Sequence, residues 1–223
     1  MDYDVNLLHT SRQNPLLVRT LYKLMSFEAL KDFRLVGGTN LALVYDHRYS
    51  VDIDLFTDKE YGTVDFQKIE ETMKAFFPSC ITPSKGTSAF GKTYFVGNSV
   101  EDSVKVDIMY TDSFLDPADN YGPLRLATRN DITAMKMEAI ATGPRKKDFW
   151  DIHFLLGYYT LEHMITIHQC RHPYTHNSSE LLEKMLTFEE VETEPAPICY
   201  LGKEWADIKL DIITEVERVK ECQ

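Results

Sequence analysis

The chain has 223 residues and a formal net charge of −11 at pH 7, a size that fits one large domain or two lobes sharing a core. Hydrophobic residues make up 43% and charged residues 26%, which is typical of globular proteins and excludes wholesale disorder. A chain this acidic is not expected to coat nucleic acid or an anionic membrane, so any polyanion must bind through a local basic patch or a metal ion.

The first half of the chain alternates between helical and extended patterns. Pro15 suits the first turn of a helix, and leucines repeat at helical spacing after it. A later apolar run ends at Gly37-Gly38, which predicts a buried strand followed by a tight turn. In chain order we expect a helix over residues 15–31, a strand over 33–36, a helix from Thr39, a strand over 51–56 and a helix over 63–77.

The second half begins with two alternating segments, 88–96 and 103–110, which predict a β-hairpin. A short strand over 124–127 is followed by a helix that starts at Asn130 or Asp131 and by another over 145–159. The rest looks helical apart from a linker over 192–200. The order of elements predicts an α+β fold, with a mixed sheet flanked by helices over residues 1–128 and a helical lobe over 129–223.

The sequence also predicts a cytoplasmic protein. No apolar run approaches the roughly 20 residues of a transmembrane helix, and the N-terminal segment lacks the regions of a secretory signal. The cysteines Cys80, Cys170, Cys199 and Cys222 are scattered, so we expect free thiols in a reducing compartment.

Asp52 and Asp54 are two residues apart on a predicted strand. Both carboxylates therefore point to one face, about 6–7 Å apart along the backbone, while Val51, Ile53 and Leu55 point to the other. Two anions held side by side repel each other unless a cation lies between them. Mg²⁺ suits a site with few carboxylates and a substrate phosphate.

Upstream of these acids, Gly37, Gly38 and Thr39 connect a strand to the start of a helix. Glycines let the backbone approach a phosphate, and a helix N-terminus offers unpaired N–H groups, to which the Thr39 hydroxyl adds a donor. Alone, two alternate aspartates fit an ordinary solvated strand. Together, a phosphate turn and a metal-binding strand indicate phosphoryl or nucleotidyl transfer.

Asp107 is a candidate third carboxylate on a neighbouring strand. There it could bind a second metal ion or take the proton from an attacking hydroxyl. The alternative is a structural one, in which Asp107 is an exposed strand acid beside Lys105 on the same face.

Two segments resemble one known family. GGTNLALVYDHRYSVDIDLF (37–56) and KMEAIATGPRKKDFWDIHFLL (136–156) are similar to motifs of the nucleotidyltransferase toxins of the AbiEii/AbiGii type, relatives of the polymerase-β superfamily. Asn40 and Asp46 depart from the pattern, since small residues are usual at both positions. The resemblance implies a polymerase-β-like nucleotidyltransferase fold.

The resemblance also implies an activity and its partners. The enzyme would use Mg²⁺, or Mn²⁺ in its place, to move a nucleoside monophosphate from an NTP to RNA, notably a tRNA 3′ end. It would act as a toxin restrained by a cognate antitoxin protein. Asp52 and Asp54 match the metal ligands, and Gly38 and Thr39 match the phosphate turn. The residues that match the downstream motifs are the nucleotide-contacting lysine, Lys136, and the later acids, Asp148 and Asp151.

The segment over residues 136–156 also suggests a function when the family resemblance is set aside. Lys136 lies in an otherwise apolar stretch of helix, so it either snorkels to solvent or reaches a triphosphate. Asp148 and Asp151 share a helix face, and their alternative role is an ordinary solvated face that pairs with Lys147. Residues 125–147 carry six basic and two acidic residues, which makes them the candidate track for RNA or triphosphate.

His163, His168, Cys170, His172 and His176 lie within fourteen residues, a composition that suits zinc. Alternate positions on one helix do not converge, however, so a polar helix end is the favoured interpretation. Two other functions remain open from the sequence. One is a small-molecule nucleotidyltransferase that acts on aminoglycoside-like acceptors, and the other is a degenerate member that only binds a nucleotide or a protein.

Overall fold

The structure, a computed structural model, describes residues 1–83 and 87–221. The chain divides into two compact units, the first formed by residues 1–46 and 50–128 and the second by residues 47–49 and 129 onward. Residues 47–49 therefore pack with the helical unit, although the acidic strand that follows them belongs to the first unit.

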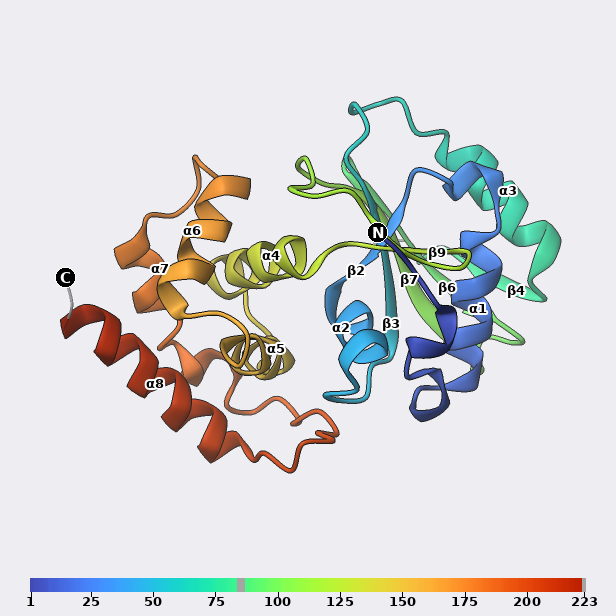
Figure 1. Cartoon of the computed structure of the whole chain (residues 1–223). Coiled ribbons are helices and arrows are strands. Elements are labelled where there is room, and N and C mark those ends of the chain that lie inside the picture. The colour runs from blue at the N-terminus through green and yellow to red at the C-terminus, as the bar shows by residue number, and fades with distance from the viewer. Residues whose placement is uncertain (84–86, 222–223) are drawn as a thin grey trace. The chain divides into compact units, whose positions relative to one another are not determined.

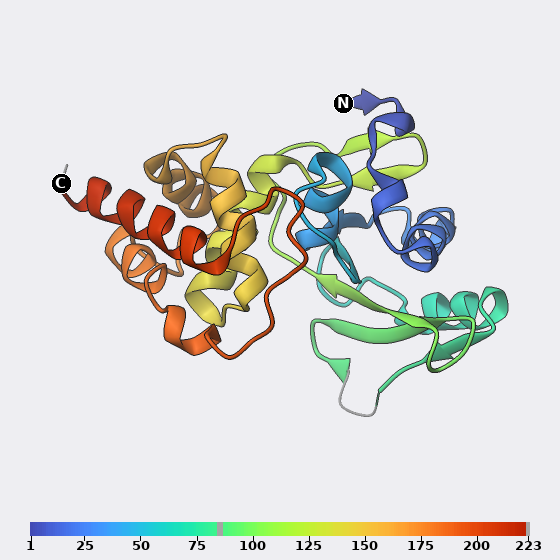
Figure 2. The ribbon, with the colours of Figure 1, turned by 90° about the horizontal axis from the view of Figure 1, so that it is seen from below.

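The first unit contains one mixed sheet. Its strands are β1 Asp2–Tyr3, β2 Arg34–Val36, β3 Asp52–Thr57, β4 Ser79–Ile81, β5 Thr87–Ser88, β6 Gly91–Gly97, β7 Ser103–Tyr110, β8 Asp119–Tyr121 and β9 Leu124–Leu126. They follow the spatial order β1-β8-β9-β2-β3-β7-β6-β4, with β5 beside β6 (Figure 1). β3 pairs parallel with β7, and β6 and β7 form the expected antiparallel hairpin, which is prominent in Figure 2. The short strands β1, β4, β5 and β8 have no counterpart among the expected elements.

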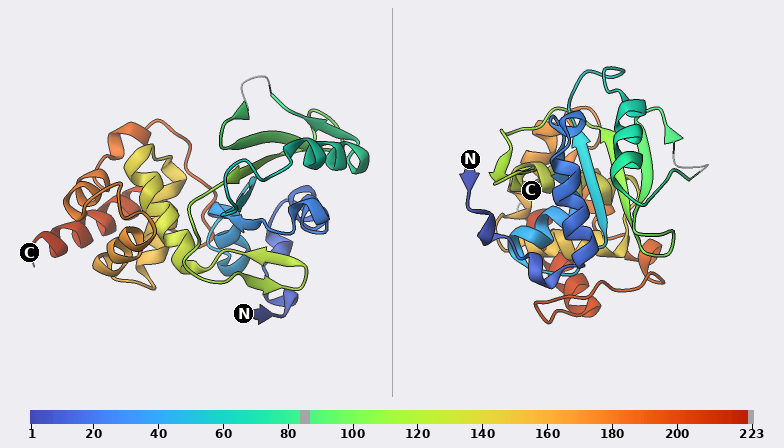
Figure 3. Two further views of the ribbon diagram at one scale, coloured as in Figure 1. Left: turned by 90° about the horizontal axis from the view of Figure 1, so that it is seen from above. Right: turned by 90° about the vertical axis from the view of Figure 1, so that its right-hand side faces the viewer.

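The helices of the first unit are α1 Pro15–Met25, α2 Gly37–Tyr45 and α3 Phe66–Phe76, with 3-10 turns at Val5–Leu7, Thr10–Arg12 and Glu28–Leu30. α1 and α3 cover the same face of the sheet (Figures 1 and 3). Asn14 accepts a hydrogen bond from the Leu16 amide and caps α1 just before Pro15. α1 is shorter than the expected helix over 15–31, because Phe27 is extended and separates it from the turn at Glu28–Leu30.

The alternation along β3 sets which side chains face the core. Ile53 and Leu55 are fully buried among the residues of the hydrophobic core, while Asp52 and Asp54 are half-buried on the opposite face. Burying each large aliphatic side chain stabilises the fold by about 1.5–3 kcal/mol. A slip of one residue would move both carboxylates into the core, so the hydrophobic pattern also fixes where the acids point.

The second unit is helical. Its helices are α4 Arg129–Thr142, α5 Lys146–Leu156, α6 Leu161–Arg171, α7 Ser178–Lys184 and α8 Trp205–Glu221, with a 3-10 turn at Phe188–Val191. α4 packs against α5, α6 and α7, and α8 packs against α5 and α6 (Figure 2). Residues 47–49 join this unit by pairing with residues 198–200, where the Tyr49 amide donates to the Ile198 carbonyl at 2.9 Å.

Aromatic rings fill part of this second core. The indole rings of Trp150 and Trp205 stack at 5.3 Å between centroids, and Phe149 meets both Trp205 and Phe188.

The described part of the chain contains no helix that is both long and apolar enough to cross a membrane. Cys80, Cys170 and Cys199 are free thiols, whereas Cys222 lies outside the described residues. The α+β class with a mixed sheet and a helical part is as expected.

Candidate active site

Three carboxylates meet on one face of the sheet in the first unit. β3 and β7 are neighbours, and their register places Asp54 directly beside Asp107 and Asp52 beside Lys105. Neighbouring strands lie about 4.8 Å apart, so Asp107 is within reach of a cation held by Asp54. The alternating burial of both strands leaves Asp52, Asp54, Lys105 and Asp107 on the same half-exposed face.

Asp107 is anchored by two neighbours. The Thr93 hydroxyl on β6 donates to its Oδ1 at 2.6 Å, and the Lys105 ammonium lies 2.5 Å from its Oδ2. Burial alone would lower the pKa of Lys105, but the hydrogen bond to Asp107 and the charges of Asp107, Asp52 and Asp54 outweigh it and raise that pKa. Lys105 therefore stays protonated and partly balances the charge of the three acids.

The glycine turn contacts the same acids. α2 starts at Gly37, two residues earlier than expected, and Gly37 has a φ of +70°. A Cβ at this position would collide with Oδ2 of Asp54, so the absence of a side chain lets the turn lie against that carboxylate. The N-cap residue Val36 supplies no side-chain acceptor to the first amides of α2.

Thr39 points into the protein. Its side chain is buried, and its hydroxyl donates to the backbone carbonyl of Asp52 and shares a 2.8 Å hydrogen bond with Ser50. The hydroxyl thus ties α2 to the start of β3 and positions Asp52. The backbone amides of the turn remain as the groups suited to a phosphate.

In the second unit, Lys136, Asp148 and Asp151 form a buried ion cluster. The Lys136 ammonium lies 2.6 Å from Asp148 and 2.7 Å from Asp151. Asp151 also accepts two hydrogen bonds from Arg48, at 2.7 and 2.8 Å, and lies 2.7 Å from Nε2 of His47. Both carboxylates are buried, so the interpretation of Asp148 and Asp151 as a solvated face is wrong, and Lys136 does not snorkel to solvent.

The charges in this cluster stabilise one another. Burial alone would raise the pKa of Asp151, yet Arg48 and Lys136, with the hydrogen bonds from His47 and Arg48, hold that pKa well below its usual range. Burial likewise opposes the charge of Lys136, but Asp148 and Asp151 raise its pKa. Asp151 and Lys136 are therefore ionised at neutral pH, and the cluster joins residues 47–48 to α4 and α5.

The sequence matches a known protein family over most of its length. Residues 19–221 match the family described as nucleotidyl transferase AbiEii toxin, type IV toxin–antitoxin system. The chain belongs to the AbiEii nucleotidyltransferase toxin family. The description of the family names a nucleotidyl transferase, the class of enzyme that the resemblance of the two sequence motifs implies.

Individual relatives are more distant. An uncharacterized protein of Aquifex aeolicus is 32% identical over 139 residues, which cover 61% of this chain and 63% of that protein's length. JHP933 of Helicobacter pylori shares the fold with a TM-score of 0.57 at 17% identity, covering 92% of this chain and 89% of its own. The nucleotidyltransferase toxin MenT4 of Mycobacterium tuberculosis gives a TM-score of 0.52 at 13% identity, with 93% and 87% covered.

Asn40 and Asp46, the two residues that depart from the AbiEii pattern, each form specific contacts within the first unit. The Asn40 side-chain amide donates to the carbonyls of Leu35 and Ala127, both at 2.9 Å, and so links α2 to the end of β2 and to the residue after β9. Asp46 adopts a left-handed conformation at the C-terminus of α2, with a φ of +53°, and forms an ion pair with Arg12. Both residues fix the ends of the helix that carries the glycine turn.

The basic segment over 125–147 is not a continuous surface track. Arg125 donates to the carbonyls of Phe33, Met25 and Leu30 within the first unit. Lys136 and Lys146 are buried, and Lys146 donates to the backbone carbonyls of Glu192 and Glu194. Half of the six basic residues therefore stabilise the fold, and a track for RNA or triphosphate through the other three, Arg129, Arg145 and Lys147, stays a prediction.

Sequence reasoning missed His47 and Arg48 in the AbiEii motif. Both residues lie in the polar stretch just before the acidic strand, and their partner Asp151 lies more than 100 residues away in the sequence. The signal that could have identified them is their position within the motif 37–56, between Thr39 and Asp52, both of which carry predicted functions.

Gly37→Ala is expected to disturb Asp54 specifically. The φ of +70° disfavours alanine, at a cost of about 1–2 kcal/mol, and the added methyl group must displace the carboxylate. We expect a loss of nucleotidyl transfer larger than the change in the unfolding midpoint explains. Gly62→Ala provides the control, since Gly62 also has a positive φ but nothing lies within 4 Å of its added Cβ. Equal activity in the two variants would contradict the prediction.

Because His47 is buried, we expect the free energy of unfolding to depend on pH. Burial is the largest influence on its pKa and lowers it from 6.5, despite the opposing effect of Asp151. Because ionised Asp151 only accepts hydrogen bonds, Nε2 carries the proton, and Nδ1 is buried without a partner among the described residues. Below pH 6.5 the unfolded chain binds a proton that the folded chain resists, so stability is lost as the pH falls.

His47→Gln keeps an N–H donor and removes this titration. Urea unfolding between neutral pH and about pH 5 should show a free energy of unfolding that falls less steeply in the variant, by at most about 1.4 kcal/mol per pH unit. Parallel curves for the two proteins would show that His47 does not titrate in this way.

Proposed function

We propose that this AbiEii-family enzyme uses Mg²⁺ to transfer a nucleoside monophosphate from an NTP to an acceptor hydroxyl on RNA, with tRNA 3′ ends as the first candidate. The observation that carries the proposal is the placement of Asp52, Asp54 and Asp107 on one face, with the Gly37 turn packed against Asp54. An NTP needs both features together, because its phosphates require amide donors and a divalent cation.

The donor set fits a hard cation. Asp52, Asp54 and Asp107 offer only oxygen ligands, which Mg²⁺ and Mn²⁺ prefer. The tight approach of Gly37 to Asp54 orients that carboxylate. When bound, the cation would neutralise charge on the triphosphate and polarise the α-phosphate.

The chain's own residues would organise the rest of the reaction. The first amides of α2, at Gly37 and Gly38, bind the phosphates, and Thr39 holds Asp52 in position through its carbonyl. The acceptor oxygen forms a bond to the α-phosphorus, the bond to the bridging oxygen breaks and pyrophosphate leaves. Asp107 has one of two roles in this scheme: it either binds a cation or receives the hydroxyl proton. The nucleotide contact that the resemblance assigns to Lys136, and the catalytic roles of Asp148 and Asp151, remain predictions.

A labelling experiment tests the activity and the acceptor. The chain is incubated with each α-labelled NTP, Mg²⁺ and total tRNA, and the RNA is separated on a denaturing gel. We expect label in tRNA, removed by digestion from the 3′ end and absent when a chelator is added. Parallel reactions with aminoglycosides test the small-molecule alternative. Label only in those reactions would overturn the RNA acceptor, and label in neither would overturn the transfer activity.

The toxin role has its own test. We propose that a cognate antitoxin protein restrains the enzyme, in keeping with the type IV toxin–antitoxin description of the family. Induced expression of the chain should stop growth, whereas expression of an Asp54→Asn variant should not. Unaffected growth with the active chain would contradict the toxin role without bearing on transfer measured in vitro.

Asp52, Asp54 and Asp107 together form what we call the acidic face of the sheet. Lys105→Met should make the stability of the protein depend more strongly on a divalent cation bound at this face. The ammonium of Lys105 lies among three carboxylates, so its removal increases their mutual repulsion. We expect a lower melting temperature without Mg²⁺ and a larger rise on adding Mg²⁺, because a ligand that binds only the folded state stabilises it. Lys92→Met is the control, since Lys92 lies on β6 and pairs with Glu70 instead. The same response in both variants would argue against a cation on this face.

A further inference from the structure

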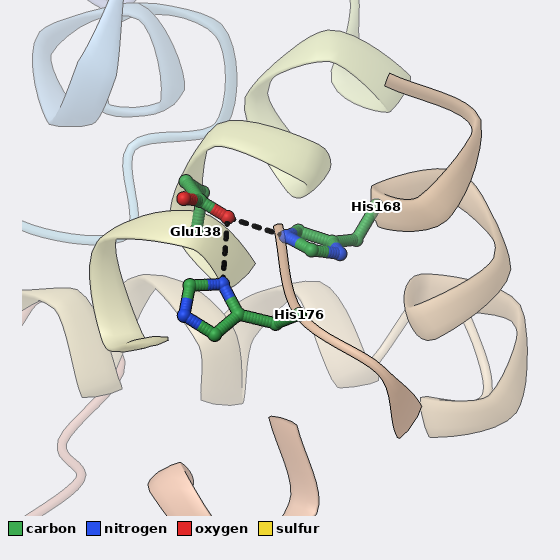
Figure 4. Close-up of side chains that lie close together, drawn as sticks. All are labelled: Glu138, His168 and His176. Atoms are coloured by element: carbon green, nitrogen blue, oxygen red, sulfur yellow. Dashed lines mark hydrogen bonds and ion pairs between the residues drawn. The ribbon is translucent and has the colours of Figure 1, made fainter. Parts of the chain in front are cut away.

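A second group of potential metal ligands lies in the helical unit, away from the acidic strands. Glu138 comes from α4, His168 from α6 and His176 from the segment between α6 and α7, and Figure 4 shows the three side chains pointing toward one another. Nε2 of His168 lies 2.7 Å from Oε2 of Glu138, and Nδ1 of His176 lies 3.3 Å from the same oxygen. The three ligand atoms lie within 4.8 Å of one another.

The chain path explains why these histidines converge. α6 ends at Arg171, and the backbone of His172 has left the helix. The following residues reverse direction, so that His176 faces α4 rather than continuing along the helix. The expectation that the histidines would not converge assumed that all of them lay on one helix, and it was wrong for this pair. His163 and Cys170 are exposed and stand outside the group.

We propose that Glu138, His168 and His176 form a site for a transition-metal ion, with Zn²⁺ as the best fit. Two imidazoles and one carboxylate are a common zinc donor set, and they leave a fourth position for water or another ligand. Mg²⁺ prefers oxygen ligands, so the chemistry of this site differs from that of the acidic face.

Two of the three spacings between ligand atoms are close to what tetrahedral zinc needs. With ligand distances of about 2.0–2.1 Å, neighbouring ligand atoms lie about 3.3 Å apart. The His176–Glu138 distance of 3.3 Å already meets this value, and the His168–Glu138 distance of 2.7 Å needs to lengthen by about half an ångström. The ligand atoms of His168 and His176 lie within 4.8 Å of each other, so on binding this pair would close by at most about 1.5 Å.

The group also has the electrostatics of a cation site. His168, His176 and the Thr175 hydroxyl, at 3.1 Å, all approach Oε2 of Glu138. Positive partial charge therefore concentrates beside one carboxylate oxygen. A divalent cation between the ligands would replace the protons on the two facing ring nitrogens and keep the same attraction to Glu138.

The site is sheltered on one side and accessible on the other. The His168 side chain is fully buried, whereas those of Glu138 and His176 are 21% and 24% exposed. A surface hollow lined by Gln169, Pro173, Tyr174, Thr175, His176 and Asn177 adjoins the site and gives an ion a path from solvent. A bound ion would fasten the segment before α7 to α4, the helix that carries Lys136.

Zinc binding to the chain tests the proposal without measuring nucleotide transfer. The full chain, without a polyhistidine tag and freed of metal by a chelator, is titrated with Zn²⁺ by calorimetry in a buffer that contains Mg²⁺. We expect one Zn²⁺ per chain and a higher melting temperature on binding. His176→Ala and Glu138→Gln should each weaken binding by more than about tenfold, and both positions are exposed enough for the variants to fold.

His163→Ala and Cys170→Ser are the matched controls, because both residues lie on α6 outside the site. Each should retain native affinity for Zn²⁺. Replacing zinc with Co²⁺ should give a visible spectrum without a thiolate band, since the proposed ligands contain no sulfur. The proposal is overturned if the native chain binds no Zn²⁺ while Mg²⁺ is present, if either control loses affinity as His176→Ala does, or if the Co²⁺ spectrum shows thiolate ligation.

Discussion

Asp54→Asn is expected to reduce nucleotidyl transfer by about 10³-fold, which corresponds to about 4 kcal/mol of transition-state stabilisation. Asp54 lies between the Gly37 turn and Asp107, so it connects the phosphate-binding and cation-binding parts of the proposed site. The amide keeps the size of the carboxylate but loses its charge. Steady-state transfer with a labelled NTP measures the effect.

Two comparisons separate a lost ligand from a damaged fold. Thermal unfolding without Mg²⁺ should show that Asp54→Asn is no less stable than the native chain, because removing one of three neighbouring anions relieves repulsion. Glu101→Gln neutralises an exposed acid in the turn between β6 and β7, the hairpin that carries Asp107, and should leave transfer unchanged. Retention of full transfer in Asp54→Asn would rule out its proposed role.

The acidic face could be predicted from sequence because it follows from local rules. Alternating burial along β3 places Asp52 and Asp54 on one face, and the same alternation along β7 does so for Asp107. The parallel pairing of β3 with β7 is what brings Asp107 beside Asp54. The hairpin β6–β7 could be predicted from its two alternating segments. β1 and β5 could not, because they have only two residues each, too few to show an alternating pattern.

The buried cluster in the second unit could not be predicted in the same way. Asp148 and Asp151 fit a solvated helix face as long as their partners are sought nearby in sequence. Their partners Lys136 and Arg48 come from another helix and from a segment that precedes β3. Long-range ion pairs leave no periodic signal. Lys136 was conspicuous as a lysine in an apolar stretch, but nothing local linked it to Asp148 or Asp151, and nothing pointed to Arg48.

Asp151→Asn is expected to destabilise the second unit by about 3–5 kcal/mol, the usual effect of removing one partner from a buried ion pair. The Asp151 side chain is fully buried and lies between Arg48, Lys136 and His47. Asparagine keeps the volume, so the loss comes from charge and not from a cavity. A typical domain is stable by only 5–15 kcal/mol, so the variant loses a large share of its stability.

Tryptophan fluorescence reports this effect selectively. The chain has two tryptophans, and both lie in the second unit: Trp150 is buried, and the half-buried Trp205 stacks on it. Urea unfolding followed by their emission should show a clearly lower midpoint in Asp151→Asn. Arg218→Ala serves as the control, because it removes an exposed pair with Glu162 in the same unit and should shift the midpoint little. Similar shifts of the urea midpoint in both variants would show that the buried ion cluster contributes no more to stability than an exposed ion pair.

Lys136→Met separates the structural role of the cluster from a nucleotide contact. If Lys136 only balances Asp148 and Asp151, the variant should lose stability while the KM for NTP, measured well below the unfolding midpoint, stays unchanged. If Lys136 also contacts the triphosphate, as the family resemblance implies, the KM should rise as well. Because the ammonium already has two carboxylate partners at 2.6 and 2.7 Å, we expect the loss of stability to dominate and the KM to change less than about tenfold, or 1.4 kcal/mol.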